Sequence, residues 1–323
     1  MKTILVLALD GVMDSSLAIT LDTLRAGQAF LARKGKPQGL CILTAGHRKQ
    51  VRTGAGLLLR PDTVFAEMLA DPVRPEWIVV PGAGLVSERD IAARLQMKDA
   101  AALMQLLQSF NDGSTKIAAA CSSVFLLAQT GLLDGRNATM TWWLAQQFRA
   151  RFPQVRLDET RMLVRDGPFL TAGSAYAQLD VALAIAADTM GSSIAHLCSR
   201  YLLIDQRPSQ ARYMMREHVQ HIDPTVVAAE RWIEKHMSAP ISIAHLSSAL
   251  AVSPKTLARR IAAASGVSPV KFIQRRRLLH AVHLLESTSM SVDTIATKVG
   301  YQDGTALRKL IKREFGTTPG ALR

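Results

Sequence analysis

The sequence has few cysteines, and they show no pattern that indicates a disulfide framework or a metal site. Cys41, Cys121 and Cys198 form no Cys-x-x-Cys pair and no even set for disulfides. No histidine spacing near them fits a structural zinc site. This cysteine usage is typical of proteins in the reducing cytosol. We therefore expect no metal and no cofactor.

Long apolar runs are also missing. No stretch approaches the ~20 residues that a membrane-spanning helix needs. The apolar run near the N-terminus covers residues 4–9 and ends at Asp10-Gly11, which is typical of a first buried strand and too short for a secretory signal. We expect a soluble, cytoplasmic protein with no membrane partner.

Acidic residues are scarce relative to basic ones, and the imbalance is local. The chain has 39 Lys and Arg against 26 Asp and Glu, a net charge of +13. Residues 225–323 alone contain 15 Lys and Arg against 6 Asp and Glu. A local surplus of this kind suits a polyanionic partner such as nucleic acid.

The length of 323 residues favours about two domains, and the first two hundred residues alternate between apolar and amphipathic segments. This alternation predicts a mostly parallel sheet with helices on both faces. We expect strands at 4–9, 39–43, 77–80 and 116–120, and helices at 17–32, 100–110, 122–130, 178–190 and 194–203. The polar stretch 205–224 is the predicted linker between a first domain at 1–204 and an all-helical second domain at 225–323.

Two segments of the second domain repeat one design. In the first, Ser242 is a good N-cap for a short helix, and Ser253-Pro254 joins a cap to a proline at the first helical position. In the second, Ser291 caps a short helix and Gly300-Tyr301 makes the turn. The helices that follow point basic and polar residues outward: Lys255, Thr256, Arg259 and Arg260, then Arg308, Lys309, Lys312 and Arg313.

A short helix, a tight turn and a basic second helix describe a helix-turn-helix, whose second helix lies in the major groove of DNA. A predicted helix at 269–286 separates the two units and fixes the distance between them. If the two units occupy successive major grooves, the spacing is about 34 Å, one turn of DNA.

Residues 225–323 resemble the AraC-type DNA-binding domain over their whole length. The matching stretches are LSSALAVSP at 246–254, ASGVSP at 264–269, RLL at 277–279, IA at 295–296, VGY at 299–301 and FGTTP at 315–319. Two positions depart from the family pattern. Ala251 replaces the usual glycine of the first turn, and Leu307 stands where the second recognition helix often has an aromatic residue.

The resemblance implies which side chains contact DNA. It places six of them near bases: Lys255, Ala258, Arg259, Thr305, Arg308 and Lys309. Arg and Lys donate to guanine O6 and N7, and Thr serves several bases. Arg260, Lys312 and Arg313 are better placed for phosphates, which supply affinity without sequence information.

In the first domain, Cys121 follows the expected strand at 116–120 directly and opens a helix. This is the arrangement of a nucleophile elbow, and Ala119 and Ser123 supply the small neighbours that it requires. We expect the N-terminus of the new helix to lower the pKa of the thiol. The loop at 81–84 and the N–H of Ser122 are candidates for an oxyanion hole.

Residues 1–200 resemble the PfpI-type, class I glutamine amidotransferase-like domain, which has a flavodoxin-like fold. The motifs are VVPG at 79–82, ACSS at 120–123, LA at 127–128, GLLDGR at 131–136 and TAGS at 171–174. This domain joined to an AraC-type reader is the layout of GlxA-like regulators. The expected fold is therefore an α/β flavodoxin-like parallel sheet domain plus an all-α domain with two helix-turn-helix units.

The same resemblance argues against catalysis. The family commonly has a histidine twenty residues after the cysteine, where this chain has Thr141, and an acidic residue near the first helix, where it has Ser15 beside Asp14. A threonine hydroxyl cannot act as the base near pH 7. We predict no enzyme activity, with Cys121 at a relic nucleophile position. The expected ligand pocket at the sheet edge is lined by Ser15, Gly82, Ala83, Cys121, Ser122, Thr141 and Trp142.

The sequence leaves three roles open for Cys121: lining a ligand pocket, an inert relic, or an oxidation sensor. Trp142 either packs in the core or offers an aromatic face to a cationic effector such as an amine or amino-acid derivative. The hypothesis is a homodimeric, ligand-responsive transcriptional regulator that binds promoter DNA and has RNA polymerase as a further partner. The alternatives are an amidotransferase- or hydratase-type cysteine enzyme with an accessory DNA-binding domain, and a ligand-independent architectural DNA binder.

Overall fold

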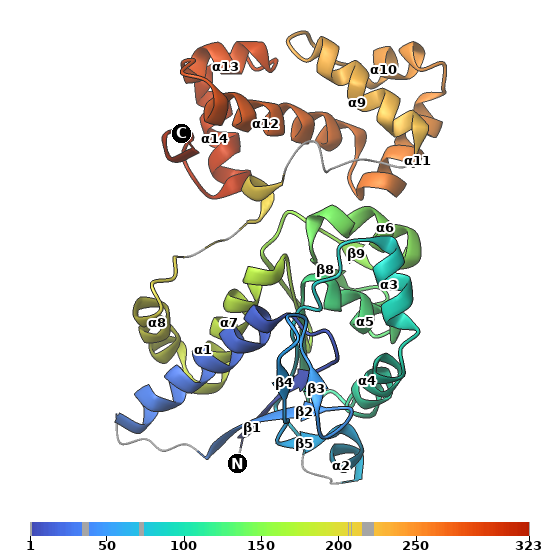
Figure 1. Ribbon diagram of the computed structural model, residues 1–323. Coiled ribbons are helices and arrows are strands. Elements are labelled where there is room, and N and C mark those ends of the chain that lie inside the picture. The colour runs from blue at the N-terminus through green and yellow to red at the C-terminus, as the bar shows by residue number, and fades with distance from the viewer. Residues whose placement is uncertain are drawn as a thin grey trace. The chain divides into compact units, whose positions relative to one another are not determined.

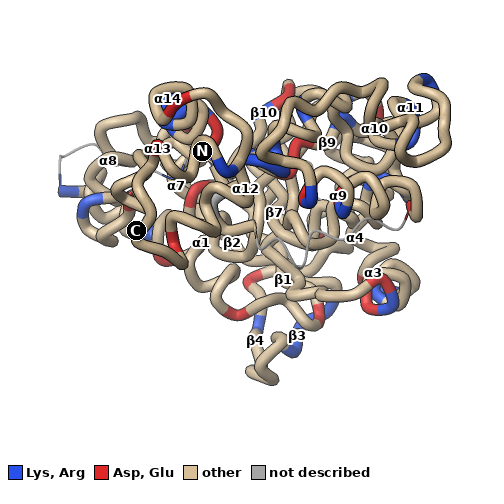
Figure 2. The backbone as a smooth tube through the Cα atoms, turned by 90° about the horizontal axis from the view of Figure 1, so that it is seen from above, with Lys and Arg blue, Asp and Glu red and all other residues tan. Residues whose placement is uncertain are grey.

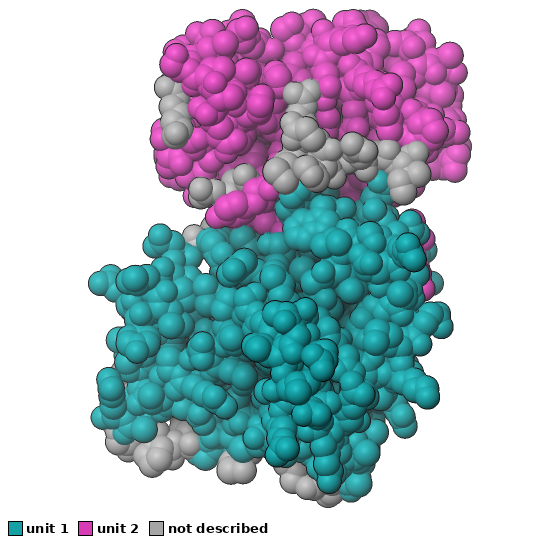
Figure 3. Space-filling model, viewed as in Figure 1, with its two compact units in different colours: residues 1–148, 152–207 teal, residues 149–151, 208–323 magenta. Residues whose placement is uncertain are grey.

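The computed structural model describes residues 2–33, 39–70, 74–205, 207, 209–214 and 223–322. The chain divides into two compact units, residues 1–148 with 152–207 and residues 149–151 with 208–323, coloured separately in Figure 3. Part of the predicted linker, namely residues 206, 208 and 215–222, lies outside the described residues.

The first unit is built on a seven-stranded sheet with the order β10-β11-β7-β6-β1-β2-β5 (Figure 1). Every neighbouring pair in it is parallel except β10 with β11. The strands are β1 Lys2–Ala8, β2 Leu40–Gly46, β5 Thr63–Val64, β6 Trp77–Val80, β7 Lys116–Ala120, β10 Leu163–Asp166 and β11 Phe169–Ala172. The predicted parallel sheet is confirmed. Sequence reasoning did not identify three of its strands: β5, β11 and the antiparallel edge strand β10.

Helices cover both faces of this sheet (Figure 1). One face packs against α1 Asp14–Arg33, α7 Gln178–Met190 and α8 Ser192–Tyr201. The other packs against α2 Phe65–Ala70, α3 Glu88–Leu95, α4 Lys98–Ser109, α5 Val124–Gln129 and α6 Ala145–Arg151. No helix in the described ranges is both long and apolar enough to cross a bilayer.

The residues of β1 show how the alternation of a strand builds both layers. Ile4 and Val6 belong to the core beneath α1 and α7, whereas Leu5 and Leu7 belong to the core beneath α4 and α5. All four are fully buried, because successive side chains of a strand point to opposite faces. A strand apolar on both faces is what a sheet covered on both sides requires.

Two small sheets lie outside the main one. β3 Val51–Arg52 pairs antiparallel with β4 Leu58–Leu59, and β8 Asn137–Ala138 pairs with β9 Arg156–Leu157. The β3–β4 hairpin is fastened to the loop after β1, since the Gly54 N–H donates to the Val12 carbonyl at 2.8 Å. These short strands have too few residues to give a periodic pattern in the sequence.

The second unit is helical in its described residues. Its helices are α9 Pro224–His236, α10 Ile243–Ala249, α11 Pro254–Ser265, α12 Pro269–Ser287, α13 Val292–Lys298 and α14 Gly304–Phe315. Short 3-10 turns lie at Ala211–Tyr213 and Pro319–Leu322. Each of these six α-helices begins at a residue whose side chain accepts a backbone N–H of its first turn: Asp223, Ser242, Ser253, Ser268, Ser291 and Asp303. The three predicted serine caps are confirmed.

Two hydrophobic cores lie within this unit, one for each helix-turn-helix. The first contains Leu246 of α10 with Leu257 and Ile261 of α11. The second contains residues of α13 and α14, among them Ile295 and Leu307. The helix α12 contributes to both, as the predicted spacer should.

Candidate functional site

The helix α11 presents its basic residues to solvent. Lys255 and Arg259 are exposed, and Ala258 between them is half-buried. Thr256 is half-buried as well, and its hydroxyl accepts a hydrogen bond from the Ser253 hydroxyl at 2.9 Å. Thr256 therefore takes part in the helix cap, and the outward charge of α11 comes from Lys255 and Arg259.

Arg260 is turned toward its own unit. Its guanidinium donates to the Thr225 hydroxyl at 2.5 Å and lies 3.4 Å from the Asp223 carboxylate. Asp223 is also the N-cap of α9. These contacts join the middle of α11 to the start of α9, and they give Arg260 a structural role that its place in the sequence does not reveal.

The helix α14 is the basic second helix of the second helix-turn-helix. Its candidate contacts Thr305, Arg308, Lys309, Lys312 and Arg313 are all exposed. Figure 2 shows Lys and Arg on α11 and on α14. Glu314 is an acidic residue within α14, whereas α11 contains no acidic residue. The two predicted recognition helices therefore differ in charge pattern.

An acidic residue of α13, Asp293, adds a negative charge next to α14. The Asp293 carboxylate accepts the Gly304 N–H at 3.0 Å and pairs with the Arg308 guanidinium at 3.3 Å. Asp293 thus joins α13 to the start of α14. Sequence reasoning missed Asp293. The signal available was its position in the first turn of the helix that precedes α14.

Cys121 stands at the end of β7 in a strained backbone conformation. Its φ is 57°, a left-handed value that non-glycine residues rarely adopt. Its N–H donates to the Gly173 carbonyl at 2.8 Å, which fastens the turn to the end of β11. The chain then enters a 3-10 turn at Cys121–Ser123 before α5. The predicted elbow geometry is confirmed.

Three segments meet at the thiol. A Cβ placed on Gly82 would lie 3.2 Å from the Cys121 Cβ and 3.0 Å from the Ser16 Oγ. The loop after β6, the first turn of α1 and the elbow therefore approach one another, and a side chain at position 82 would be crowded. Ser16 is fully buried, whereas the predicted Ser15 is half-buried. Ser16 is the α1 residue that reaches this junction.

Thr141 is the second hydroxyl at the thiol. It is fully buried, and its Oγ1 has no hydrogen-bond partner among the described residues. It lies close enough to Cys121 to favour the thiolate, as the neighbouring Ser122 does. A hydroxyl assists a thiolate by donating a hydrogen bond but cannot take its proton near pH 7.

Burial raises the pKa of the Cys121 thiol, and the influence of Ser122 and Thr141, which favours the thiolate, only partly opposes it. The expectation that the helix N-terminus lowers this pKa is therefore wrong. The side chain is 2% exposed, and removing the thiolate from water costs more than the start of a short helix returns. The thiol is protonated at neutral pH.

The loop after β6 is held against the elbow by the two serines that follow Cys121. The Ser122 hydroxyl accepts the Leu85 N–H at 3.1 Å, and the Ser123 hydroxyl donates to the Pro81 carbonyl at 2.6 Å. Both serines are fully buried, and Ala83 in the loop is buried too. The predicted lining residues Gly82, Ser122 and Thr141 are thus assembled around Cys121.

Trp142 follows Thr141 and is buried, with 7% of its surface exposed. Its ring meets that of Trp143 edge-on, with the ring centres 5.4 Å apart. Trp142 begins the 3-10 turn Trp142–Leu144. The indole of Trp142 therefore directly follows Thr141 in the chain.

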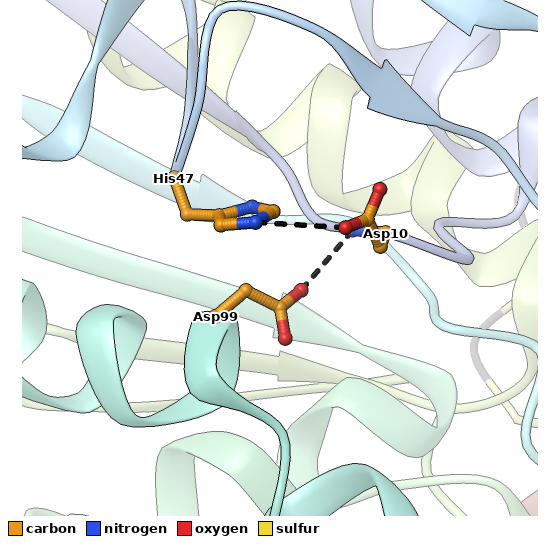
Figure 4. A group of neighbouring side chains, drawn as sticks. All are labelled: Asp10, His47 and Asp99. Carbon is orange, nitrogen blue, oxygen red and sulfur yellow. Dashed lines mark hydrogen bonds and ion pairs between the residues drawn. The ribbon is translucent and has the colours of Figure 1, made fainter.

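Asp10, His47 and Asp99 form a second polar cluster at the same end of the sheet (Figure 4). Asp99 is held by both terminal nitrogens of Arg94 at 2.7 Å, and the two side chains are buried. Burial opposes ionisation of Asp10, but the Arg52 N–H and the Arg48 guanidinium hold its pKa below the usual value. The carboxylates of this cluster accept hydrogen bonds from arginine side chains and backbone N–H groups. We therefore interpret the cluster as a structural contact that holds the loops after β1 and β2.

The sequence matches two family models: the DJ-1/PfpI family over residues 2–188 and a helix-turn-helix domain over residues 246–323. The first match covers more than half of the chain, and this protein belongs to the DJ-1/PfpI family. The predicted combination of a flavodoxin-like sheet domain with a helix-turn-helix domain is confirmed.

Two relatives are named as regulators. The chain is 29% identical over 216 residues to the HTH-type transcriptional regulator GlxA of Rhizobium meliloti, covering 64% of this chain and 65% of that protein. It is 24% identical over 221 residues to the HTH-type transcriptional regulator CdhR of Pseudomonas aeruginosa, covering 68% and 66%. The matches therefore span just under two thirds of these relatives.

A solved structure shows the same fold in the first unit. DJ-1beta of Drosophila melanogaster matches with a TM-score of 0.51 and 22% identity, covering 64% of this chain and 99% of that one. At this identity the likeness concerns the fold.

Proposed function

We propose that this protein is a sequence-specific DNA-binding transcriptional regulator whose DJ-1/PfpI unit binds a small molecule and carries out no catalysis. The observation that carries the proposal is the pair of exposed basic helices α11 and α14, each following a short capped helix and a tight turn. This is the arrangement in which a second helix enters the major groove. The names of the two relatives agree with it.

We assign base contacts to the exposed cations of the two helices, Lys255 and Arg259 on α11 and Arg308 and Lys309 on α14. Thr305 and Ala258 complete the two reading surfaces. Lys312 and Arg313, one turn further along α14, contact phosphates in this proposal. Arg260 is given a phosphate contact only if it leaves the Thr225 hydroxyl.

The absence of catalysis is argued from the surroundings of Cys121. A nucleophilic thiol needs a base or an environment that favours the thiolate. Here the groups that act on the thiol are those of Ser122 and the Thr141 hydroxyl, and burial raises its pKa. The position where the family commonly has histidine is Thr141. Within the described part of the chain, neither group that acts on the thiol can accept its proton for an amidotransferase or hydratase reaction.

The junction at Cys121 is the proposed effector site, with Ser15 or its neighbour Ser16, Gly82, Ala83, Ser122, Thr141 and Trp142 as its lining. Support comes from the Thr141 hydroxyl, which is fully buried without a hydrogen-bond partner among the described residues. Buried polar groups are normally paired, so this hydroxyl suits a ligand's polar group. An amine or amino-acid derivative is the proposed class, because an indole face attracts a cation.

The proposed domain layout is a sensor and dimerisation domain at 1–204, a linker at 205–224 and a DNA-binding domain at 225–323. In it a homodimer in the cytoplasm binds promoter DNA, and RNA polymerase is a further partner. Effector binding changes regulation only if it binds two arrangements of the chain with different affinity.

Sequencing the genomic fragments that the full chain retains tests the DNA-binding part of this proposal. We expect a recurrent motif with two subsites, and an Arg259→Ala variant that no longer enriches it. The control is Arg33→Ala, which removes an Arg from α1 in the first unit. Retention of random fragments by the wild-type chain, with no enriched motif, would contradict sequence-specific regulation and favour an architectural DNA binder.

A thermal-shift screen of amines and amino-acid derivatives tests the sensor part. A ligand at 100 times its Kd stabilises the folded state by ~2.7 kcal/mol. We expect a compound that raises the unfolding temperature of the wild-type chain but not that of Thr141→Val. The Cys121→Ala variant should still bind promoter DNA. Turnover of a screened compound that is abolished by Cys121→Ala would instead establish the enzyme alternative.

A further inference from the structure

The helix α12 packs in both helix-turn-helix cores. Two adjacent arginines lie where its buried residues pass from the first core to the second. Phe272 and Ile273 belong to the first core, and residues from Leu278 onward belong to the second. Arg276 and Arg277 stand between these two sets. Apolar packing along one shared helix leaves some freedom in how each core rotates about it, whereas hydrogen bonds at fixed angles restrict that rotation.

Arg276 fastens α12 to the first core alone. Its guanidinium lies 2.9 Å from the Glu230 carboxylate and 2.6 Å from the Glu234 carboxylate, both on α9. The Arg276 side chain is 8% exposed. These ion pairs stabilise the packing of α9 on α12, and both of their acidic partners lie in the first helix-turn-helix half.

Arg277 joins the two halves. Its Nη2 donates to the Ala239 carbonyl at 2.7 Å, in the segment between α9 and α10. Its Nη1 donates to the Gly300 carbonyl at 3.1 Å, in the turn between α13 and α14. The guanidinium also lies 5.9 Å from the centre of the Tyr301 ring. One planar group therefore holds a loop of the first helix-turn-helix half and the turn of the second.

The backbone at Gly300 shows how closely these parts approach. Its φ is +80°, and a Cβ there would lie 2.1 Å from the Met237 carbonyl oxygen and 2.7 Å from the Arg277 guanidinium carbon. The turn that launches α14 thus lies directly on the end of α9. Since Gly300 is four residues before the first residue of α14, a shift at this contact moves the recognition helix.

We propose that Arg277 is a positioning residue that sets the distance and angle between α11 and α14, and so determines which spacing of two DNA subsites the protein accepts. The inference rests on the proposed function, in which each helix reads one subsite. Two linked binding modules gain about 10²–10⁴-fold over one module when the link holds them at the right geometry, and lose that gain when it does not. Arg277 supplies geometry without touching DNA.

The test uses the full chain and duplexes built from its selected motif, with the spacer between subsites changed by one or two base pairs in each direction. Duplexes that keep only one subsite complete the set. The variants are Arg277→Lys, which retains the charge but not the two-pronged donor, and Arg277→Met. Tyr301→Leu removes the ring and keeps both carbonyl partners. The matched control is Arg276→Lys, the neighbouring arginine whose contacts lie on α9.

We expect the wild-type chain to prefer one spacing over its neighbours. Both Arg277 variants should bind that spacing about tenfold more weakly, with a flattened spacing profile and unchanged affinity for single subsites. Tyr301→Leu should flatten the profile less, and Arg276→Lys should lower the unfolding temperature without changing the preferred spacing. Circular dichroism before each titration confirms that the helices are intact.

Three results would overturn the inference. The first is a folded Arg277→Lys variant with the wild-type spacing profile. The second is an Arg277 variant that loses all duplexes and single subsites equally, which indicates a purely structural role. The third is a wild-type chain that binds its motif with no spacing preference, which contradicts this inference but leaves the regulator proposal intact. Failure of the wild-type chain to bind any duplex selectively would refute the proposed function itself.

Discussion

Ala251 and Gly300 occupy the same place in the two helix-turn-helix turns. Ala251 lies two residues after the end of α10, and Gly300 lies two residues after the end of α13. Both have a positive φ, 51° at Ala251 and 80° at Gly300. The first turn therefore holds an alanine in a conformation that favours glycine. This explains why glycine is usual at this position in the AraC-type domains that residues 225–323 resemble.

Replacing Ala251 by glycine should stabilise the second unit. A left-handed conformation costs a non-glycine residue roughly 1–2 kcal/mol, and the flexibility of glycine in the unfolded chain costs roughly 0.5–1 kcal/mol. The expected gain for Ala251→Gly is about 0.5 kcal/mol. Hydrogen exchange of the amides in α10–α14 of the full chain measures it.

Gly300→Ala is the opposite change at the equivalent place and should destabilise the unit by about 2 kcal/mol or more. The new Cβ would meet the Met237 carbonyl oxygen at 2.1 Å, so the turn must move away from α9. Equal effects of the two substitutions on exchange would contradict the different surroundings of these turns.

Asp293→Asn should strengthen DNA binding. The amide oxygen still accepts the Gly304 N–H, but the negative charge beside α14 is gone and Arg308 loses its ion pair. Because the pair is exposed, the expected effect is about a two- to fivefold lower Kd. Fluorescence anisotropy at several salt concentrations measures it.

Asp293→Glu is the control for charge and should bind close to wild type. If Asp293→Asn binds DNA more weakly than the glutamate variant, then Asp293 is needed to orient Arg308 toward the groove. The competition between Asp293 and DNA assumed here would then be wrong.

Arg259→Ala and Arg313→Ala should separate base reading from phosphate contact. Removing a base-reading arginine costs ~1–3 kcal/mol and relaxes preference at one base position. Removing a phosphate contact weakens all sequences alike and makes the slope of log K against log salt shallower by about one. Binding of a set of single-base variants of the motif distinguishes the two. A uniform loss for Arg259→Ala would remove its assignment to a base.

Cys121 should react slowly with iodoacetamide at pH 7, and its rate should keep rising at pH values where free cysteine, with a pKa of about 8.5, is already fully ionised. The cause is burial, which raises the pKa of this thiol. Mass spectrometry of Cys121 and of the half-buried Cys41 in one sample gives both rates. Fast alkylation of Cys121 at pH 7 would show an activated thiol.

The sign of the linked stability effect follows from the same shift. A thiol whose pKa is raised in the folded state keeps its contribution to stability below the pKa of the unfolded chain, near about 8.5, and loses it as the pH rises further. Wild-type stability should therefore fall more steeply above pH 8.5 than that of Cys121→Ala. Urea unfolding between pH 7 and 10 tests this, and parallel curves would contradict the buried, protonated thiol.

The helix-turn-helix units were predictable because their signals are local. Ser242, Ser253 and Ser291 cap helices within three residues of themselves, and Pro254 starts α11. The elbow at Cys121 was predictable for the same reason, since a strand, a small neighbour and a helix follow one another directly in the chain.

The rest depends on contacts between residues far apart in the sequence. Ser16 rather than Ser15 faces Gly82, because the register of α1 against the sheet decides which side chain points inward. The pKa of Cys121 depends on how completely neighbouring segments exclude water. Arg260 meets Thr225 and Arg277 meets Ala239 and Gly300 only once α9, α12 and the second turn have packed. Composition and local pattern determined that this chain has two basic helices, each after a helix-turn-helix turn, and a parallel sheet domain. Long-range packing alone decided which charged side chains are left facing outward.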